Sequence, residues 1–191
     1  MEMREFTTLD EELLRQIGRL RVEAWETETA RAAEMPTWLD EFDQTARHWV
    51  VFREGTPIAA ARLSVHQSLT EVPDAESYAG VFAEPPEPPI ASLNRLVVHP
   101  SARGAGLSKQ LDLVRLDAAE SLGCCSANLS TASGPRRVSQ LIGWGFELVG
   151  EGPRFHKPPL CHLPPPAVML CRLPRIHARA GVGPETPLQI P

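Results

Sequence analysis

The chain has 191 residues, of which 42% are hydrophobic and 23% are charged, and its formal net charge is −5. This composition is typical of a globular domain, and the length is sufficient for one hydrophobic core. The acidic balance argues against a general nucleic-acid or membrane-surface binder. No stretch reaches 18 apolar residues and the N-terminus has no apolar signal core. We therefore expect a cytoplasmic protein whose four cysteines are thiols.

The first half of the chain predicts helices followed by a hairpin. Apolar residues at helical spacing predict a helix over residues 10–25, and a second short helical region is expected over residues 27–39. Strands are predicted for residues 48–53 and 57–67, joined by a tight turn. Residues 69–89 are acidic and rich in proline, which predicts a long connection.

An apolar strand then runs into a glycine turn and an amphipathic helix. Residues 93–98 read as a buried strand that Pro100 ends, and the helix begins at Leu107 and stops at Gly123. The spacing of its apolar residues leaves Arg115 facing solvent. The N–H groups of residues 104–108 would point along the helix axis at an anion such as a phosphate.

The remaining sequence predicts a strand over residues 125–131, a helix that starts at Pro135, and a final strand pair at 146–150 and 167–173. Together, residues 1–174 are expected to form one domain. Residues 175–191 are expected to be a disordered tail.

The turn Arg103-x-x-Gly106-x-Ser108 resembles the Arg/Gln-x-x-Gly-x-Gly/Ala motif of the GNAT acyltransferases. The alternative is an ordinary strand-to-helix turn with a surface arginine. The resemblance implies an α/β (α+β) fold with a mixed, mostly antiparallel sheet of about six to seven strands and about four helices. It also implies that the turn grips the pyrophosphate of acetyl-CoA or a longer acyl-CoA, while the preceding strand pairs with the pantetheine arm. The implied cofactor-binding residues are Leu96, Val97, Val98, Arg103, Gly104, Ala105, Gly106, Leu107 and Ser108.

A second group of residues is similar to the signature of acyl-homoserine-lactone synthases and long-chain N-acyl amino acid synthases. The substrate-binding residues that this similarity implies are Arg21, Trp25, Asp40, Asp43, Arg62 and Arg95. Their pattern has a glutamate where this chain has Ser92, so the particular product is not carried over. Alternatively, the arginines and aspartates form a structural ion-pair network between the first helix and the sheet. In either case Arg62, inside an apolar strand, requires a charged partner.

Transfer of an acyl group to an amine needs a proton acceptor and donors for the thioester oxygen. The backbone N–H of Val97 or Val98 is the candidate donor if the strands splay. In the GNAT family a tyrosine on the second core helix usually protonates the departing thiolate, but this chain has Leu141 there. We therefore predict departure without a general acid. The alternative acid is Tyr78, the sole tyrosine, if the acidic loop folds over the cleft.

The candidate catalytic residues are Asn94 as a water-holding group, Glu76 as a base and Tyr78 as the alternative acid, with Glu71, His66 and His99 as further bases. Cys124 and Cys125 would suit a covalent acyl relay, but direct transfer needs none. No metal site is expected, because Cys161, His162, Cys171 and His177 lack paired spacing.

The resemblance thus implies an acyl-CoA-dependent N-acyltransferase that acts on a small-molecule amine. Three alternatives stay open: an enzyme like the lactone or N-acyl amino acid synthases, a non-catalytic acyl-CoA sensor, and a protein-modifying acetyltransferase. No nucleic-acid or membrane partner is expected, and a homodimer is one option for the oligomeric state.

Overall fold

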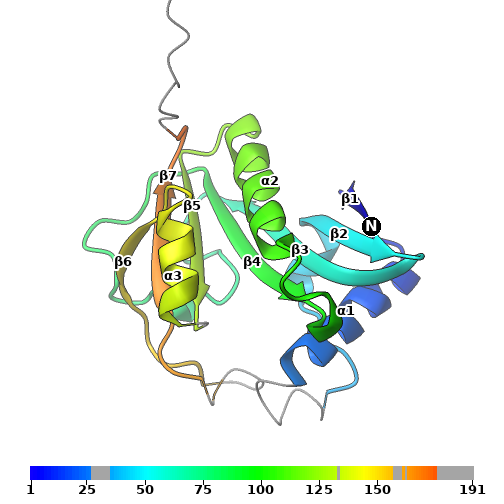
Figure 1. The fold of residues 1–191 in the computed structure, drawn as a ribbon. Helices are drawn as coiled ribbons and strands as arrows, with labels where there is room; N and C mark the ends of the chain where they lie inside the picture. Colours follow the sequence, from blue (N-terminus) through cyan, green and yellow to red (C-terminus); the bar gives the residue numbers. More distant parts are fainter. Residues whose placement is uncertain (27–34, 133, 157–160, 162, 176–191) are drawn as a thin grey trace, which may run out of the picture.

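The computed structural model describes residues 1–26, 35–132, 134–156, 161 and 163–175. Its elements are β1 (Glu2–Phe6), α1 (Glu11–Glu26), the 3-10 helix η2 (Glu41–Gln44), β2 (Arg47–Arg53), β3 (Thr56–His66), η3 (Ala75–Tyr78), β4 (Ile90–Val98), η4 (Pro100–Ala102), α2 (Leu107–Ser121), β5 (Ser126–Thr131), α3 (Pro135–Ile142), β6 (Glu147–Glu151) and β7 (Ala167–Arg172). The strands form one seven-stranded sheet in the order β1-β2-β3-β4-β5-β7-β6 (Figure 1). Since β4 and β5 are parallel and the other neighbouring pairs are antiparallel, the predicted mixed, mostly antiparallel sheet is confirmed.

Helices cover both faces of this sheet. Alternate residues of β3 point in opposite directions, so Ala59 and Ala61 pack with α2, while Ala60 packs with α1. The segment between β3 and β4, which carries η3, covers the α1 face beside Ile90 and Val168. In Figure 1 the sheet opens between β4 and β5 toward the same end at which α2 begins.

The predicted elements from residue 48 onward agree with the structure to within a few residues. Most of the helical region predicted over 27–39 lies outside the described residues, and its described part, 35–39, is not helical. The described residues contain three α-helices rather than about four. Four elements were not predicted: β1 and the 3-10 helices η2, η3 and η4. The expected tail lies outside the described residues except at its first position, Arg175.

Candidate active site

The glycine turn before α2 forms one end of the site. Gly104 and Gly106 have φ values of +84° and +75°, which residues with a Cβ adopt only with strain. His99 caps η4 by accepting from the backbone N–H of Ser101, so it acts here as a turn residue. The turn therefore presents the first N–H groups of α2 toward an open cavity.

This donor-side cavity has a volume of about 520 Å³. Its walls are Ala24, Trp25, Leu96, Val97, Val98, Ala102, Arg103, Gly104, Gly106, Leu107, Ser108, Arg136 and Arg137. All predicted cofactor-binding residues except Ala105, which is exposed on the turn, line it. Arg103 Nη2 donates to the carbonyl oxygen of Ala24 at 2.7 Å and so joins the turn to the end of α1. Three guanidinium groups make this end of the site positive.

The sheet is interrupted beside that cavity in two ways. Between Ala60 and Arg62 of β3, the pairing with β4 shifts register, and Arg95 has a φ of +51°, the geometry of a β-bulge. On its other edge, β4 pairs with β5 only as far as Ser92 and Asn128. The rest of β4 therefore has an edge that β5 does not pair, as the predicted splay requires.

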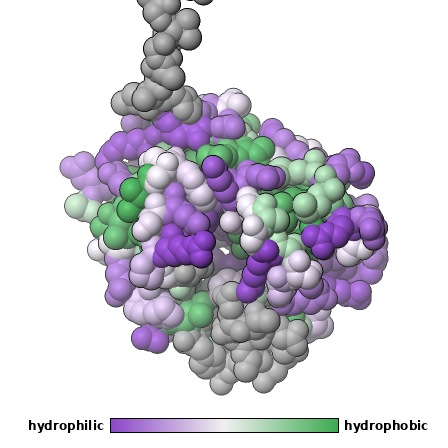
Figure 2. Space-filling view, viewed as in Figure 1, coloured by the Kyte–Doolittle hydropathy of each residue, from purple (hydrophilic) through white to green (hydrophobic). Residues whose placement is uncertain are grey.

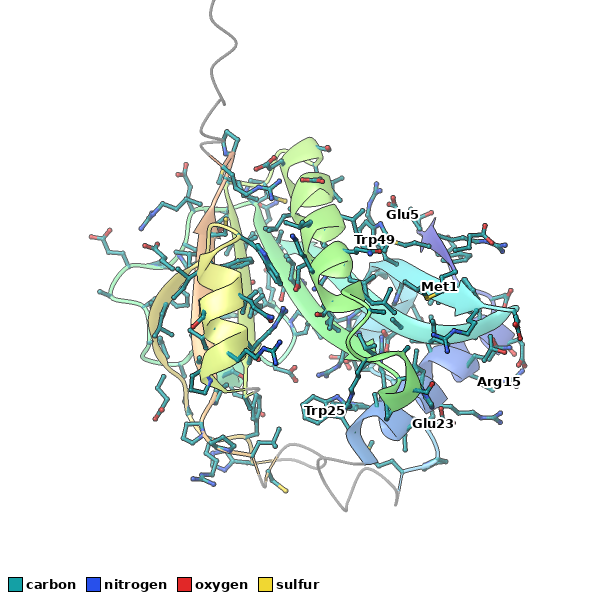
Figure 3. All side chains as sticks on the ribbon, viewed as in Figure 1. Met1, Glu5, Arg15, Glu23, Trp25 and Trp49 are labelled. Atoms are coloured by element: carbon teal, nitrogen blue, oxygen red, sulfur yellow. The ribbon has the colours of Figure 1, made fainter. Side chains whose placement is uncertain are left out.

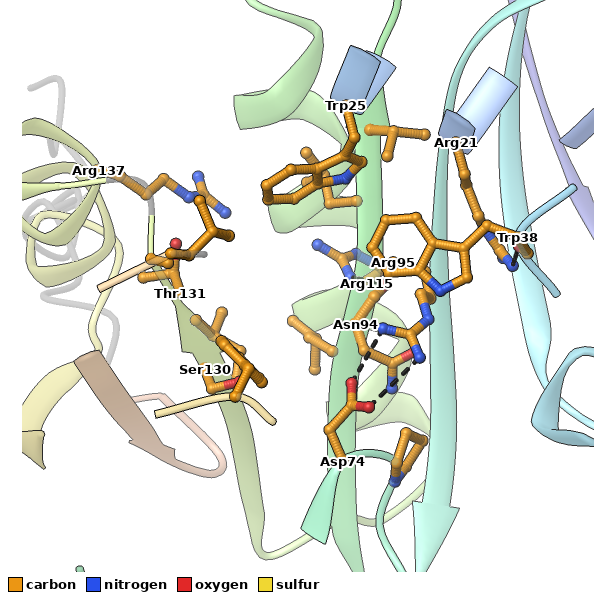
Figure 4. A pocket seen from close by; sticks show the side chains of 18 of the residues that line it. Arg21, Trp25, Trp38, Asp74, Asn94, Arg95, Arg115, Ser130, Thr131 and Arg137 are labelled. Atoms are coloured by element: carbon orange, nitrogen blue, oxygen red, sulfur yellow. Dashed lines mark hydrogen bonds and ion pairs between the residues drawn. The ribbon is translucent and has the colours of Figure 1, made fainter. Parts of the chain in front are cut away.

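A central cavity of about 140 Å³ lies where the two strands part. Figure 4 shows Ser130, Thr131 and Arg137 on one side of it, opposite Trp25, Trp38, Asn94 and Arg95. Figure 3 shows Trp25 reaching from α1 toward this space, and Figure 2 shows a hollow near the centre of the same face. The residues that it shares with the donor-side cavity are Trp25, Leu96, Val97 and Arg137.

A third, acidic cavity of about 470 Å³ adjoins the central one. Its charged wall residues are Asp40, Glu41, Glu71, Asp74, Glu76 and Arg95. The residues that it shares with the central cavity are Trp38, Pro73, Asp74, Arg95 and Phe155. The three cavities therefore follow one another along β4, from a positive end to a negative end.

A buried cluster of charges lies between α1, η2 and the sheet. Both Nη atoms of Arg21 donate to the carboxylate of Asp43 at 2.8 Å, and Arg62 donates to the same carboxylate at 2.8 Å. These three residues are 1%, 2% and 0% exposed. Burial alone would raise the pKa of Asp43, but the hydrogen bonds and charges of the two arginines hold it well below its usual range. This inner half of the cluster joins α1 to β3.

The outer half of the cluster reaches the cavities. Arg62 also pairs with Asp40, whose second oxygen accepts from Arg95 at 2.9 Å. Arg95 in turn donates to Asp74 at 2.9 Å (Figure 4) and lies over the ring of Trp38. The side chains of Asp40, Arg95 and Asp74 are 19%, 11% and 30% exposed. The prediction that Arg21, Asp40, Asp43 and Arg62 form one charged cluster is thus confirmed. Through Arg95 and Asp74 the cluster extends to the acidic cavity.

Arg115 is buried, at 1% exposed, so the expectation that it faces solvent is wrong. Its Nε donates to the carbonyl of Leu111 and its Nη1 to the carbonyl of Arg62 at 3.0 Å. Its Nη2 pairs with Asp112, which also accepts from Arg137 of α3 at 2.6 Å. Burial lowers the pKa of Arg115 to about 10, so it stays charged at neutral pH. Sequence analysis missed this link between α2, the sheet and α3.

The candidate catalytic residues lie in different parts of the site. The side-chain amide of Asn94 bonds to Arg62 and Ser92 within the central cavity wall. Glu76 is exposed at the acidic cavity. Tyr78 is 4% exposed and lines the central cavity. Asp74, which lines both of these cavities, was not predicted.

The remaining candidate bases lie away from the centre. His66 bonds to Ser64 Oγ at 2.8 Å, and burial lowers its pKa. Glu71 accepts from the backbone N–H of Gln67.

Within the part of the chain that the structure describes, no helix is long and apolar enough to cross a membrane. The same described residues hold no group of three or more His, Cys, Asp or Glu side chains arranged for a metal ion.

The seven-stranded sheet, with a glycine turn before α2 beside a parted β4 and β5, is the arrangement that the sequence resemblance implied. The sequence matches the Acetyltransferase (GNAT) family over residues 8–139. The chain therefore belongs to the GNAT family, and the predicted enzyme class is confirmed. No curated protein matches the sequence.

Solved structures show the same fold at low sequence identity. An acyl-CoA N-acyltransferase from Pseudomonas aeruginosa is 21% identical, with a TM-score of 0.60 over 89% of this chain and 98% of that chain. The acyl-homoserine-lactone synthase LasI is 14% identical, with a TM-score of 0.61 over 88% and 86%. A chain of the NatC complex bound to Gag peptide and CoA is 16% identical, with a TM-score of 0.57 over 91% and 99%. These similarities establish the fold.

Proposed function

We propose that the protein transfers an acyl group from an acyl-CoA to a small-molecule amine by direct attack. The observation that carries this proposal is the row of three connected cavities along the open edge of β4. A donor that enters from the positive end and an acceptor that enters from the negative end would meet in the central cavity. Holding two reactants in this way removes much of the entropic barrier to their reaction.

The acyl-CoA would occupy the donor-side cavity. The N–H groups of residues 104–108 would donate hydrogen bonds to its pyrophosphate. The positive charges of Arg103 and Arg137 would attract the same group. Because N–H groups alternate in direction along a strand and that of His99 donates to Ile58, the N–H of Val98 faces the open edge. Val98 is therefore our candidate donor to the thioester oxygen.

The amine would occupy the acidic cavity, where carboxylates favour an ammonium group before it loses a proton. Trp38 forms an apolar wall of this cavity, and the ring of Trp25, 5.9 Å from that of Trp38, continues the wall into the central cavity. Asp74 lies on the boundary between the acidic and central cavities, so we propose that it accepts the proton through water, with Glu76 at the outer rim. Asn94 bonds to Arg62 and Ser92 at the cavity wall and its backbone carbonyl accepts from Arg115, so we propose that it holds this wall in place.

The thiolate would leave without a protein acid. Burial raises the pKa of Tyr78, whereas a thiol has a pKa of about 8.5. Proton transfer from Tyr78 to the thiolate would be uphill, so this hydroxyl keeps its proton. Free CoA would pick up its proton from water or from the ammonium of the acceptor.

The charged cluster favours a second candidate function. Its residues are those of the lactone and N-acyl amino acid synthase signature, so a long-chain donor would place the protein with those enzymes. A sensor would bind acyl-CoA without turnover. The cytoplasmic location, the disordered tail and a homodimer stay predictions.

Calorimetry with CoA tests the donor site. Arg103→Ala should weaken binding by about 1–3 kcal/mol, the scale of a charge-assisted hydrogen bond. Gly106→Val should also weaken binding, because its φ of +75° is strained for a β-branched residue. Arg172→Ala is the matched control, because this arginine on β7 is 81% exposed and lies outside the donor-side cavity. Unchanged affinity in both test variants would refute the proposed donor site.

A further inference from the structure

A gap between β4 and β5 leads away from the central cavity. The two strands run parallel, and their pairing ends at Ser92 and Asn128. The next residues, Leu93 and Leu129, line the central cavity. An acyl chain longer than acetyl would extend from the thioester carbon into this gap.

Tyr78 closes the gap. Its side chain lines the central cavity together with Leu93 of β4 and with Leu129 and Ser130 of β5, so it lies where the strands part. Its ring packs with Ile90 and Val168. Burial raises the pKa of its hydroxyl, so the group stays neutral at ordinary pH.

The backbone around Tyr78 fits closely against the sheet. A Cβ at position 152 would stand 2.1 Å from the carbonyl oxygen of Ser77, so only Gly152 lets η3 approach this far. Ser77 and Tyr78 are 1% and 4% exposed. The ring of Phe82 lies 6.4 Å from that of Tyr78. An entering chain would therefore have to unpack η3 in order to displace Tyr78.

The room left for an acyl group is small. The central cavity has about 140 Å³, and an apolar cavity of roughly 150 Å³ holds one benzene molecule. Leu93, Leu129 and Phe155 add apolar walls on which a methyl group can pack. An acetyl or propionyl group fits this volume; a longer alkyl chain would need the gap that Tyr78 fills, because the adjoining acidic cavity is lined by carboxylates.

We infer that Tyr78 determines acyl specificity: its ring fills the gap between β4 and β5, stops the acyl group at the end of the central cavity and restricts the enzyme to short acyl-CoA donors. This inference rests on the proposed function. It also distinguishes the chain from an enzyme that uses long-chain donors.

Calorimetry with CoA, acetyl-CoA and octanoyl-CoA tests the inference without an acceptor. The wild-type protein should bind acetyl-CoA more tightly than octanoyl-CoA by at least about 10-fold, the scale on which a closed apolar pocket rejects added methylenes. Tyr78→Ala should shift this ratio toward octanoyl-CoA by at least about 10-fold. Tyr78→Phe keeps the ring and should keep the ratio. Tyr78→Leu, which shortens the reach but stays apolar, replaces the alanine variant if that variant does not fold.

Each outcome is informative. A shifted ratio in Tyr78→Ala or Tyr78→Leu, with CoA affinity unchanged, supports the inference. Tight octanoyl-CoA binding by the wild type, or an unchanged ratio in both shortened variants, overturns it while leaving the proposed donor site in place. If CoA itself does not bind, the proposed function fails and this inference fails with it.

Discussion

Replacing Arg62 by methionine should strongly destabilise the protein. Arg62 is fully buried and donates to Asp40, Asp43 and Asn94. Its loss would leave two carboxylates to share the remaining arginines, with Asp43 only 2% exposed. Breaking a buried ion pair from one side costs about 3–5 kcal/mol, and we expect a decrease of that size in the free energy of unfolding.

The outer half of the cluster supplies a matched comparison. The side chain of Arg95 is 11% exposed and that of its partner Asp74 is 30% exposed. Water can therefore solvate the carboxylate of Asp74 when Arg95→Met removes its partner. We expect this variant to lose less stability than Arg62→Met. Since Arg95 and Asp74 line both the central and the acidic cavities, kcat/KM should nevertheless fall by at least about 10-fold, the scale of one lost charged contact.

Urea denaturation at pH 7, followed by circular dichroism, gives the free energies, and acyl-transfer assays give kcat/KM. The double variant Arg62→Met, Asp43→Asn should recover part of the lost stability, because it removes the stranded charge. If Arg62→Met stays within about 1 kcal/mol of the wild type, the division into a structural inner half and a functional outer half is wrong. Loss of stability in Arg95→Met equal to that in Arg62→Met would contradict it as well.

Two further predictions concern buried sites. Burial lowers the pKa of His48, whose Nε2 lies 2.9 Å from the carbonyl oxygen of Asp43, to about 4. The unfolded chain binds this proton from about pH 6.5 downward and the native protein does not, so stability should fall by up to about 3 kcal/mol between pH 6.5 and 4. His48→Gln should flatten this slope in urea titrations, and His66→Gln should flatten it less; identical slopes in all three proteins would refute the assignment. Gly152→Ala should cost about 1–3 kcal/mol through overpacking against Ser77, and an unchanged melting temperature would show that η3 is not tightly docked.

Local sequence patterns predicted six of the seven strands and the glycine turn before α2, because these depend on short-range signals, whereas the mixed sheet followed from the family resemblance. Strand alternation and glycine spacing identified the residues from β2 to the start of α2. The pairing of Arg62 was also predictable, since an arginine inside an apolar strand requires a nearby carboxylate. The extension of that cluster to Asp74 was not predictable from the sequence. The segment 69–89 has no periodicity that would show which of its carboxylates faces the sheet.

Arg115 shows the limit of the helical pattern. The buried face of α2 includes Asp112 and Arg115 between Leu111 and Leu116, whereas hydrophobic periodicity counts only apolar residues and assigns charged ones to solvent. The spacing of Asp112 and Arg115, one helical turn apart, was the available signal. Their burial depends on contacts with the carbonyl groups of the β3–β4 bulge. These contacts are long-range in sequence, so a local helical pattern does not show them.

A structure of the protein in complex with CoA tests the central claim most directly. The account predicts the pyrophosphate on the N–H groups of residues 104–108, the pantetheine arm along the open edge of β4 beyond Ser92, and the sulfur near Val98, where the donor-side cavity meets the central one. A complex with CoA bound elsewhere, or with β5 paired to β4 along its full length and the cavity closed, would contradict it.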